Sequence, residues 1–137
     1  MAQPQEVRRQ YNALINSGNV AFGVFPNGAA AIALTAAAAW VFGAWVEIVA
    51  TVGGADVWFI GVAVGAFSAP AADYDVGIGT GAGAAEVSFL SLPCWAPVIF
   101  IPFPRLIAAA TRIAGRVRTS SGAADTMTVK VLVATGV

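Results

Sequence analysis

The stretch that decides the fold is Thr111-Arg112-Ile113-Ala114-Gly115-Arg116-Val117-Arg118-Thr119. Its arginines alternate with Ile113, Gly115 and Val117, so that one face is cationic and the other apolar. Successive side chains of a β-strand point to opposite faces, and this period of two therefore predicts a half-buried strand. A second alternating strand, residues 125–133, follows a Ser-Ser-Gly-Ala turn. We expect the two to form the closing hairpin of an all-β domain.

The composition indicates a chain with apolar surface that must be buried against a membrane or another protein. Its 137 residues suit one domain, yet 58% are hydrophobic, only 10% are charged, and the mean hydropathy is +0.79. Ordinary globular domains carry about 25% charged residues. Either the chain lies in a membrane or other subunits cover it. The seven acidic residues balance the seven basic ones, which argues against nucleic acid as a partner.

Three charge-free runs raise the question of a membrane span: residues 29–46, 57–72 and 87–104. Alanine dominates the first run and contributes little to membrane insertion. The third run contains four prolines, which no helix interior would tolerate together. We therefore expect no membrane span and favour a cover made of other protein subunits.

The two ends of the chain differ in character. Residues 1–19 predict an N-terminal arm, in which a short helix would place Val7, Tyr11 and Leu14 on one face. This polar start lacks the apolar core of a secretory signal, so we expect synthesis in the cytoplasm. Residues 20–137 predict a single β-sandwich domain.

About eight strands are expected, separated by turns and without a long helix. Residues 40–52 and 57–66 predict a hairpin, and residues 99–101 an edge strand between prolines. The alanine-rich residues 29–39 favour an extended segment packed on a partner, and residues 105–110 a connection or short helical turn. The other expected strands are residues 20–25, 73–78, 86–92, 111–119 and 125–133. The pattern indicates a jelly-roll-like antiparallel β-sandwich.

No residue pattern indicates catalysis or a cofactor. The chain has no histidine and a single cysteine, Cys94, so neither a Ser-His-Asp triad nor a Cys/His zinc site can be built. Asp73 and Asp75 could share a cation, but exposed carboxylates at a strand start are more often solvated. We expect no enzyme activity, no cofactor and no metal. One alternative stays open, because some aromatic residues could line a sugar platform: Trp40, Trp45, Trp58, Trp95, Phe100 and Phe103.

Short sequence segments between residues 40 and 133 resemble those of small tailed-bacteriophage virion proteins with a β-sandwich. The segments are Trp45-Val46-Glu47-Ile48, Asp56-Val57-Trp58-Phe59-Ile60-Gly61-Val62, Asp75-Val76-Gly77-Ile78-Gly79 leading to Ala85-Glu86, and Ile101-Pro102-Phe103-Pro104 leading to Thr111-Arg112-Ile113-Ala114-Gly115-Arg116. Proteins of this kind decorate or cement capsids, or belong to tails and head fibres, and they act by binding. The resemblance therefore implies a virion structural protein without catalytic residues.

We accordingly expect a capsid cement or decoration protein, made in the host cytoplasm and located on the capsid surface of the virion. Its expected partners are the major capsid protein and its own copies, as a homotrimer. The expected subunit contacts are Val7, Tyr11, Leu14, Arg112, Arg116 and Arg118. The alternative is a carbohydrate- or receptor-binding module of a tail or head fibre.

Overall fold

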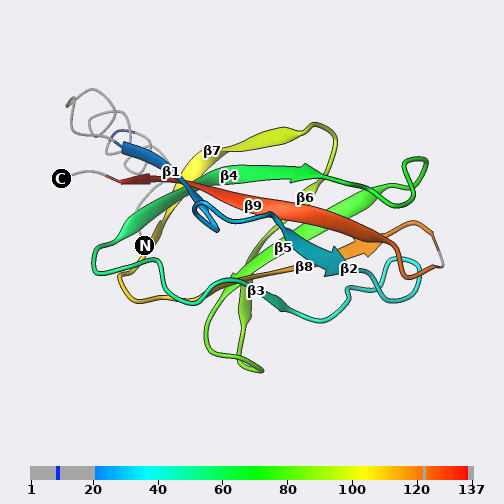
Figure 1. The fold of residues 1–137 in the computed structure, drawn as a ribbon, viewed down its shortest axis with the longest axis horizontal. Helices are drawn as coiled ribbons and strands as arrows, with labels where there is room; N and C mark the ends of the chain where they lie inside the picture. The colour runs from blue at the N-terminus through cyan, green and yellow to red at the C-terminus, as the bar shows by residue number, and fades with distance from the viewer. Residues whose placement is uncertain (1–8, 10–20, 122, 136–137) are drawn as a thin grey trace.

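The structure is a computed structural model that describes Arg9, residues 21–121 and residues 123–135 (Figure 1). Two antiparallel sheets lie face to face. One has the order β1-β9-β4-β7, with β2 also paired to β9, and the other has the order β3-β8-β5-β6. The strands are β1 (Ala21–Phe25), β2 (Ile32–Thr35), β3 (Val46–Val49), β4 (Val57–Gly65), β5 (Tyr74–Thr80), β6 (Val87–Pro93), β7 (Val98–Ile107), β8 (Ile113–Thr119) and β9 (Thr126–Thr135).

The strand order is that of a jelly roll, which confirms the expected fold class. Strand β1 pairs with the last part of β9 and β2 with its first part, so β1 and β2 together occupy one edge position. Counted in this way, the chain has eight strand positions, ordered 1-8-3-6 in one sheet and 2-7-4-5 in the other. Two interlocked Greek keys of this kind define the jelly roll.

The two hairpins expected from the sequence are both wrong. Strands β3 and β4 lie in different sheets, and so do β8 and β9. Alternation of apolar and polar residues shows that a strand has one buried face. Two consecutive strands show this pattern whether they pair in one sheet or face each other across the core from different sheets. Among the strands of the described residues, only β5 and β6 follow one another in the chain and also pair within one sheet.

The core lies between the sheets, and a β-bulge decides which residues of β4 reach it. The pairing of β4 shifts register between Phe59 and Gly61, which leaves Ile60 as the extra residue. Such a bulge reverses the alternation of faces. Phe59 and Val62 are therefore fully buried, whereas Trp58 is only half-buried and stands outside the core cluster. Strict alternation over residues 57–66 would instead place Trp58 and Val62 on the same face.

Three further segments differ in detail from expectation. The strand expected over residues 40–52 is regular only in β3, Val46–Val49. Arg105 belongs to β7, where a connection was expected. Within residues 29–39, β2 is an extended strand, as predicted, whereas residues 38 and 39 form a bend and a turn. Strand β2 pairs with β9 of its own chain. Among the described residues, no helix is long and apolar enough to cross a membrane.

Candidate binding surfaces

The outer face of the β3-β8-β5-β6 sheet carries the three arginines of β8 and the turn before it. Ile113 and Val117 are fully buried beneath them, which confirms the predicted alternation. Arg112 bridges two carboxylates: its Nε lies 2.9 Å from Glu47 Oε2 and its Nη1 lies 2.9 Å from Glu86 Oε1. Arg118 Nε lies 3.0 Å from Asp75 Oδ2.

Aromatic rings from the segment before β3 cover the same face. The guanidinium of Arg116 lies 4.3 Å from the ring centres of both Phe42 and Trp45. The guanidinium of Arg118 lies 4.8 Å from the Phe42 ring. Phe42 therefore stands between two arginines, an arrangement that cation–π attraction stabilises.

Glycines in β5 make room for this aromatic cover. A Cβ atom on Gly79 would lie 2.8 Å from Cη2 of Trp45, and one on Gly77 would lie 3.4 Å from Cε1 of Phe42. The backbone also holds the segment, because the Gly43 N–H donates to the Val117 carbonyl oxygen at 3.0 Å. Residues 40–45 therefore pack onto this sheet as an irregular continuation of its edge.

The predicted subunit contacts fall into two groups. Arg112, Arg116 and Arg118 share one face, as expected, and each already has partners within its own chain. Their part in subunit contacts stays a prediction, with only their remaining exposed surface available for it. The other group, Val7, Tyr11 and Leu14, lies outside the described residues.

Glu86 is the more buried of the two carboxylates in the arginine bridge. Its side chain is 5% exposed and accepts a hydrogen bond from Arg112. Its own backbone N–H, then Arg112 and the Ala84 N–H, lower the pKa of Glu86 below its ordinary value, against the opposing effect of burial. The bridge joins β3 to the start of β6, because Glu47 lies in β3 and Glu86 directly precedes Val87.

The outer face of the other sheet is apolar along two rows that cross β1, β9, β4 and β7. The first row is Phe22, Ala134, Trp58 and Leu106, and the second is Val24, Leu132, Gly61 and Phe100. Phe22 is 63% exposed, Phe100 65% and Leu106 50%. Neither row contains a charged residue, and we call these two rows the apolar face.

A hollow of about 510 Å³ opens in the apolar face. It lies between Phe22 and Val24 on one side and Phe100 on the other, with Ile60 and Leu132 also lining it. Gly61 contributes to its shape, because the second row has no side chain between Leu132 and Phe100. The apolar face therefore offers both projecting rings and a recess that could receive an apolar side chain.

The sequence did not reveal the apolar face as a surface. The bulge at Ile60 reverses the alternation of β4, and residues 101–104 of β7, with two prolines, arch out of the pairing between Phe100 and Arg105. The sugar platform left open as an alternative is also divided. Trp45 packs on Arg116, Trp58 and Phe100 lie on the opposite sheet, and Trp40 and Trp95 line a separate pocket.

The two aspartates considered as cation ligands have other surroundings. Asp75 pairs with Arg118, and the backbone N–H of Asp73 donates to Ser120 Oγ at 2.9 Å. In the described part of the chain, no group of three or more His, Cys, Asp or Glu side chains is placed to hold a metal ion.

Comparison with known proteins adds little. No protein-family model matches the sequence, and no curated protein matches it. Among solved structures, a chain from the structure of infectious bursal disease virus, Gx strain, is similar with a TM-score of 0.39 and 15% identity, over 85% of this chain and 32% of that chain. A likeness at this level carries no argument about function. The resemblance to tailed-phage virion proteins stays a prediction.

Proposed function

We propose that the protein is a virion structural protein that acts by adhesion, as a cement or decoration protein on the capsid surface. Its partners would be the major capsid protein and its own copies. The observation that carries the proposal is the uncovered apolar face, with Phe22 and Phe100 each more than 60% exposed. Monomeric soluble proteins rarely leave large contiguous apolar patches in water, and such patches commonly mark protein–protein contacts.

The asymmetry between the two sheets supports the proposal. Residues 40–45 cover the β8 and β5 part of one sheet's outer face with rings packed on arginines, whereas the apolar face of the other sheet lies open. Burying an exposed phenylalanine contributes about 1.5–3 kcal/mol. Several such residues would stabilise an assembled shell, since a protein that binds only the assembled state shifts the equilibrium toward it. This mode of action needs neither catalysis nor a cofactor.

Binding to virus particles tests the proposal. Particles stripped of the protein are mixed with purified protein, and the bound fraction is measured by sedimentation. The Phe100→Asp variant should bind at least about 30-fold more weakly, since placing a charge in an apolar contact costs about 2 kcal/mol or more. Val87→Asp is the matched control, because Val87 is 68% exposed and lies in the other sheet.

Two outcomes would count against the proposal. Equal binding by the Phe100→Asp and Val87→Asp variants would show that the apolar face is not the contact surface. Absence of the protein from purified particles would exclude a role in the virion. A chain without residues 1–19 tests the predicted arm separately. We expect it to keep the sandwich fold and to lose attachment to shells.

The second candidate function is a carbohydrate- or receptor-binding module of a tail or head fibre. It is favoured by one observation, that two exposed tryptophans, Trp40 and Trp95, line the same pocket. For such a module, Phe100→Asp would leave binding to the receptor unchanged.

A further inference from the structure

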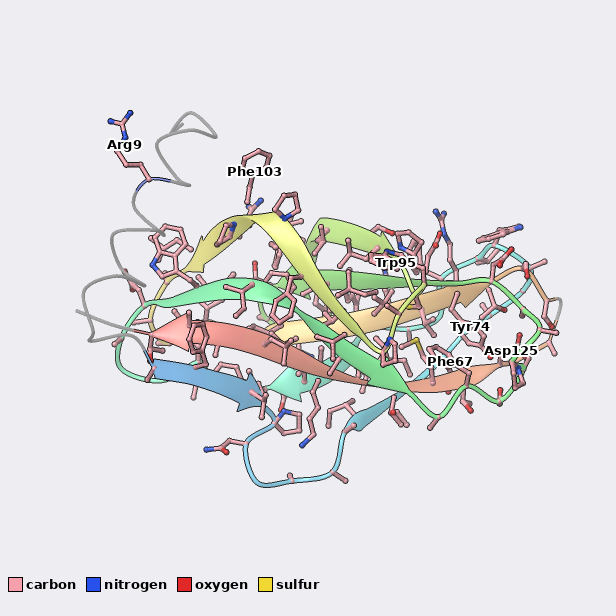
Figure 2. All side chains as sticks on the ribbon, turned by 90° about the horizontal axis from the view of Figure 1, so that it is seen from above. Arg9, Phe67, Tyr74, Trp95, Phe103 and Asp125 are labelled. Carbon is pink, nitrogen blue, oxygen red and sulfur yellow. The ribbon has the colours of Figure 1, made fainter. Side chains whose placement is uncertain are left out.

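A pocket of about 290 Å³ lies at the end of the molecule where β5 begins and β6 ends. Trp40, Asp73, Tyr74, Asp75 and Trp95 are among its lining residues. Figure 2 shows Trp95 and Tyr74 in the half of the molecule that holds Asp125, away from Arg9. The pocket belongs to the β3-β8-β5-β6 sheet and is separate from the apolar face.

The two tryptophans in this pocket are exposed yet held by the backbone. Trp95 is 75% exposed and Trp40 is 47% exposed. The Trp95 N–H donates to the Pro93 carbonyl oxygen at 3.1 Å, and the Trp40 N–H donates to the Thr119 carbonyl oxygen at 2.7 Å. Trp40 also has a φ of 57°, a left-handed conformation that is unusual for a bulky residue and concentrates at functional sites. The pocket thus presents flat apolar surfaces from two different parts of the chain.

Carboxylates stand beside these rings. The main chain of Asp73 is fixed by two hydrogen bonds with Ser120, one in each direction, of 2.9 and 3.0 Å. The side chain of Asp75 accepts a hydrogen bond from Arg118. Ionised carboxylates are acceptors only, so the pocket can receive hydrogen bonds from hydroxyl groups.

We propose that this pocket binds a neutral saccharide, with a pyranose ring against Trp95 and Trp40 and its hydroxyls donating to Asp73 and Asp75. A pyranose combines a flat C–H face with a rim of hydroxyls, which matches aromatic surface next to carboxylate acceptors. The volume lies near the lower end of the range for small-ligand pockets, about 300–1,000 Å³, and suits one or two sugar rings.

An organic cation is the other ligand class that aromatic and acidic residues attract. Here the guanidinium of Arg118 lies 5.8 Å from the Trp40 ring centre and 3.0 Å from Asp75. It already occupies the position of a cation beside both groups and would repel a second one. The observations therefore favour a neutral ligand.

Indole N–H signals in a two-dimensional ¹H–¹⁵N NMR spectrum test the proposal directly. The chain has four tryptophans, so four indole signals can be assigned with single Trp→Phe variants. The probes are methyl glycosides of glucose, galactose, mannose, rhamnose and N-acetylglucosamine with their disaccharides, and choline as the cationic comparison. At least one saccharide should shift the signals of Trp40 and Trp95 and leave that of Trp58 unchanged, with a Kd on the order of millimolar for a single ring.

Variants then separate binding from damage to the fold. Trp95→Ala should weaken saccharide binding about tenfold or more, because it removes the stacked ring. Phe100→Ala is the matched control, since Phe100 is similarly exposed but lies on the other sheet. Asp73→Asn should weaken binding less, because the amide keeps one acceptor.

The proposal would be overturned if no saccharide of the panel moved both tryptophan signals, if choline alone moved them, or if Trp95→Ala kept the full affinity. These results do not depend on the apolar face. Loss of particle binding would leave the saccharide site standing, and the reverse also holds.

Discussion

At Gly61 the absence of a side chain lets two strands approach closely next to the bulge. A Cβ atom there would collide with the carbonyl oxygen of Ile99, and backbone cannot move aside as a flexible side chain can. The same residue leaves the apolar face open between Leu132 and Phe100. One glycine therefore serves both the pairing of β4 with β7 and the form of the outer surface.

Gly61→Ala should destabilise the protein by about 1–3 kcal/mol, because the added methyl overpacks a rigid backbone contact. The free energy of unfolding, from urea denaturation followed by tryptophan fluorescence, measures this. Gly65→Ala is the control in the same strand: the nearest heavy atom to its Cβ position is Thr128 Oγ1 at 3.9 Å, so we expect a change within about 0.5 kcal/mol. Equal losses in the two variants would contradict the close approach at Gly61.

Among the elements, β3, β8 and the start of β6 are tied together by Arg112 and its two carboxylates. The pKa of Glu86 is lower in the folded chain than in the unfolded chain, so the folded state gives up this proton more readily. The stabilising effect is thus fully present above the ordinary carboxyl value of 4.5 and is lost as the pH falls through the lower folded value.

Glu86→Gln should therefore lower the melting temperature at neutral pH and flatten its decline with acid. Melting temperatures measured by circular dichroism from neutral pH to below the ordinary carboxyl pKa of 4.5 show this as two curves that converge at the acid end. Asp56→Asn is a comparison with a carboxylate that accepts a hydrogen bond only from a backbone N–H, that of Ala109. Parallel curves for Glu86→Gln and the unmodified protein would contradict the role assigned to Glu86.

Most strands could be predicted from the sequence, but their pairing could not. Alternation located β5, β8 and β9 because each has one face in the core and one outside. It carries no information on which strand lies alongside, and two hairpins were wrong for that reason. The bulge at Ile60 has no sequence signal of its own, since every residue from Val57 to Ala66 is apolar or glycine.

The candidate surfaces were less predictable than the fold. The cationic face of Arg112, Arg116 and Arg118 followed from spacing alone. Its aromatic cover did not, because residues 40–45 read as part of a strand rather than as a segment lying against β8. The pocket brings together Trp40, Asp73 and Trp95 from three separate parts of the chain, and only the topology places them side by side.

At the scale of the whole molecule, the two broad faces are unequal, and we expect this to favour self-association. Residues 40–45 cover part of one outer face, whereas the apolar face presents Phe22 and Phe100 to water. Copies of the protein would bury these rings against one another, which is compatible with the expected homotrimer.

The unmodified protein should therefore form oligomers in a concentration-dependent way, as measured by sedimentation velocity. The double variant Phe22→Asp with Phe100→Asp should shift the population to monomer, because each introduced charge would lose its hydration in the contact. Trp95→Asp, at an exposed aromatic position outside the apolar face, should leave the distribution unchanged. A monomeric unmodified protein, or a variant as oligomeric as its parent, would contradict this role for the apolar face.

The pairing of Ala21 with Thr135 has a practical consequence for joining this protein to others. The start of β1 lies beside the end of β9. Thr126 lies at the other end of β9, where its carbonyl oxygen accepts a hydrogen bond from the Ser68 N–H near the tryptophan pocket. The ten residues of β9 span roughly 30 Å. A domain fused before β1 or after β9 would be attached at the same end of the sandwich. The opposite end, with Trp40 and Trp95, would remain accessible to a ligand.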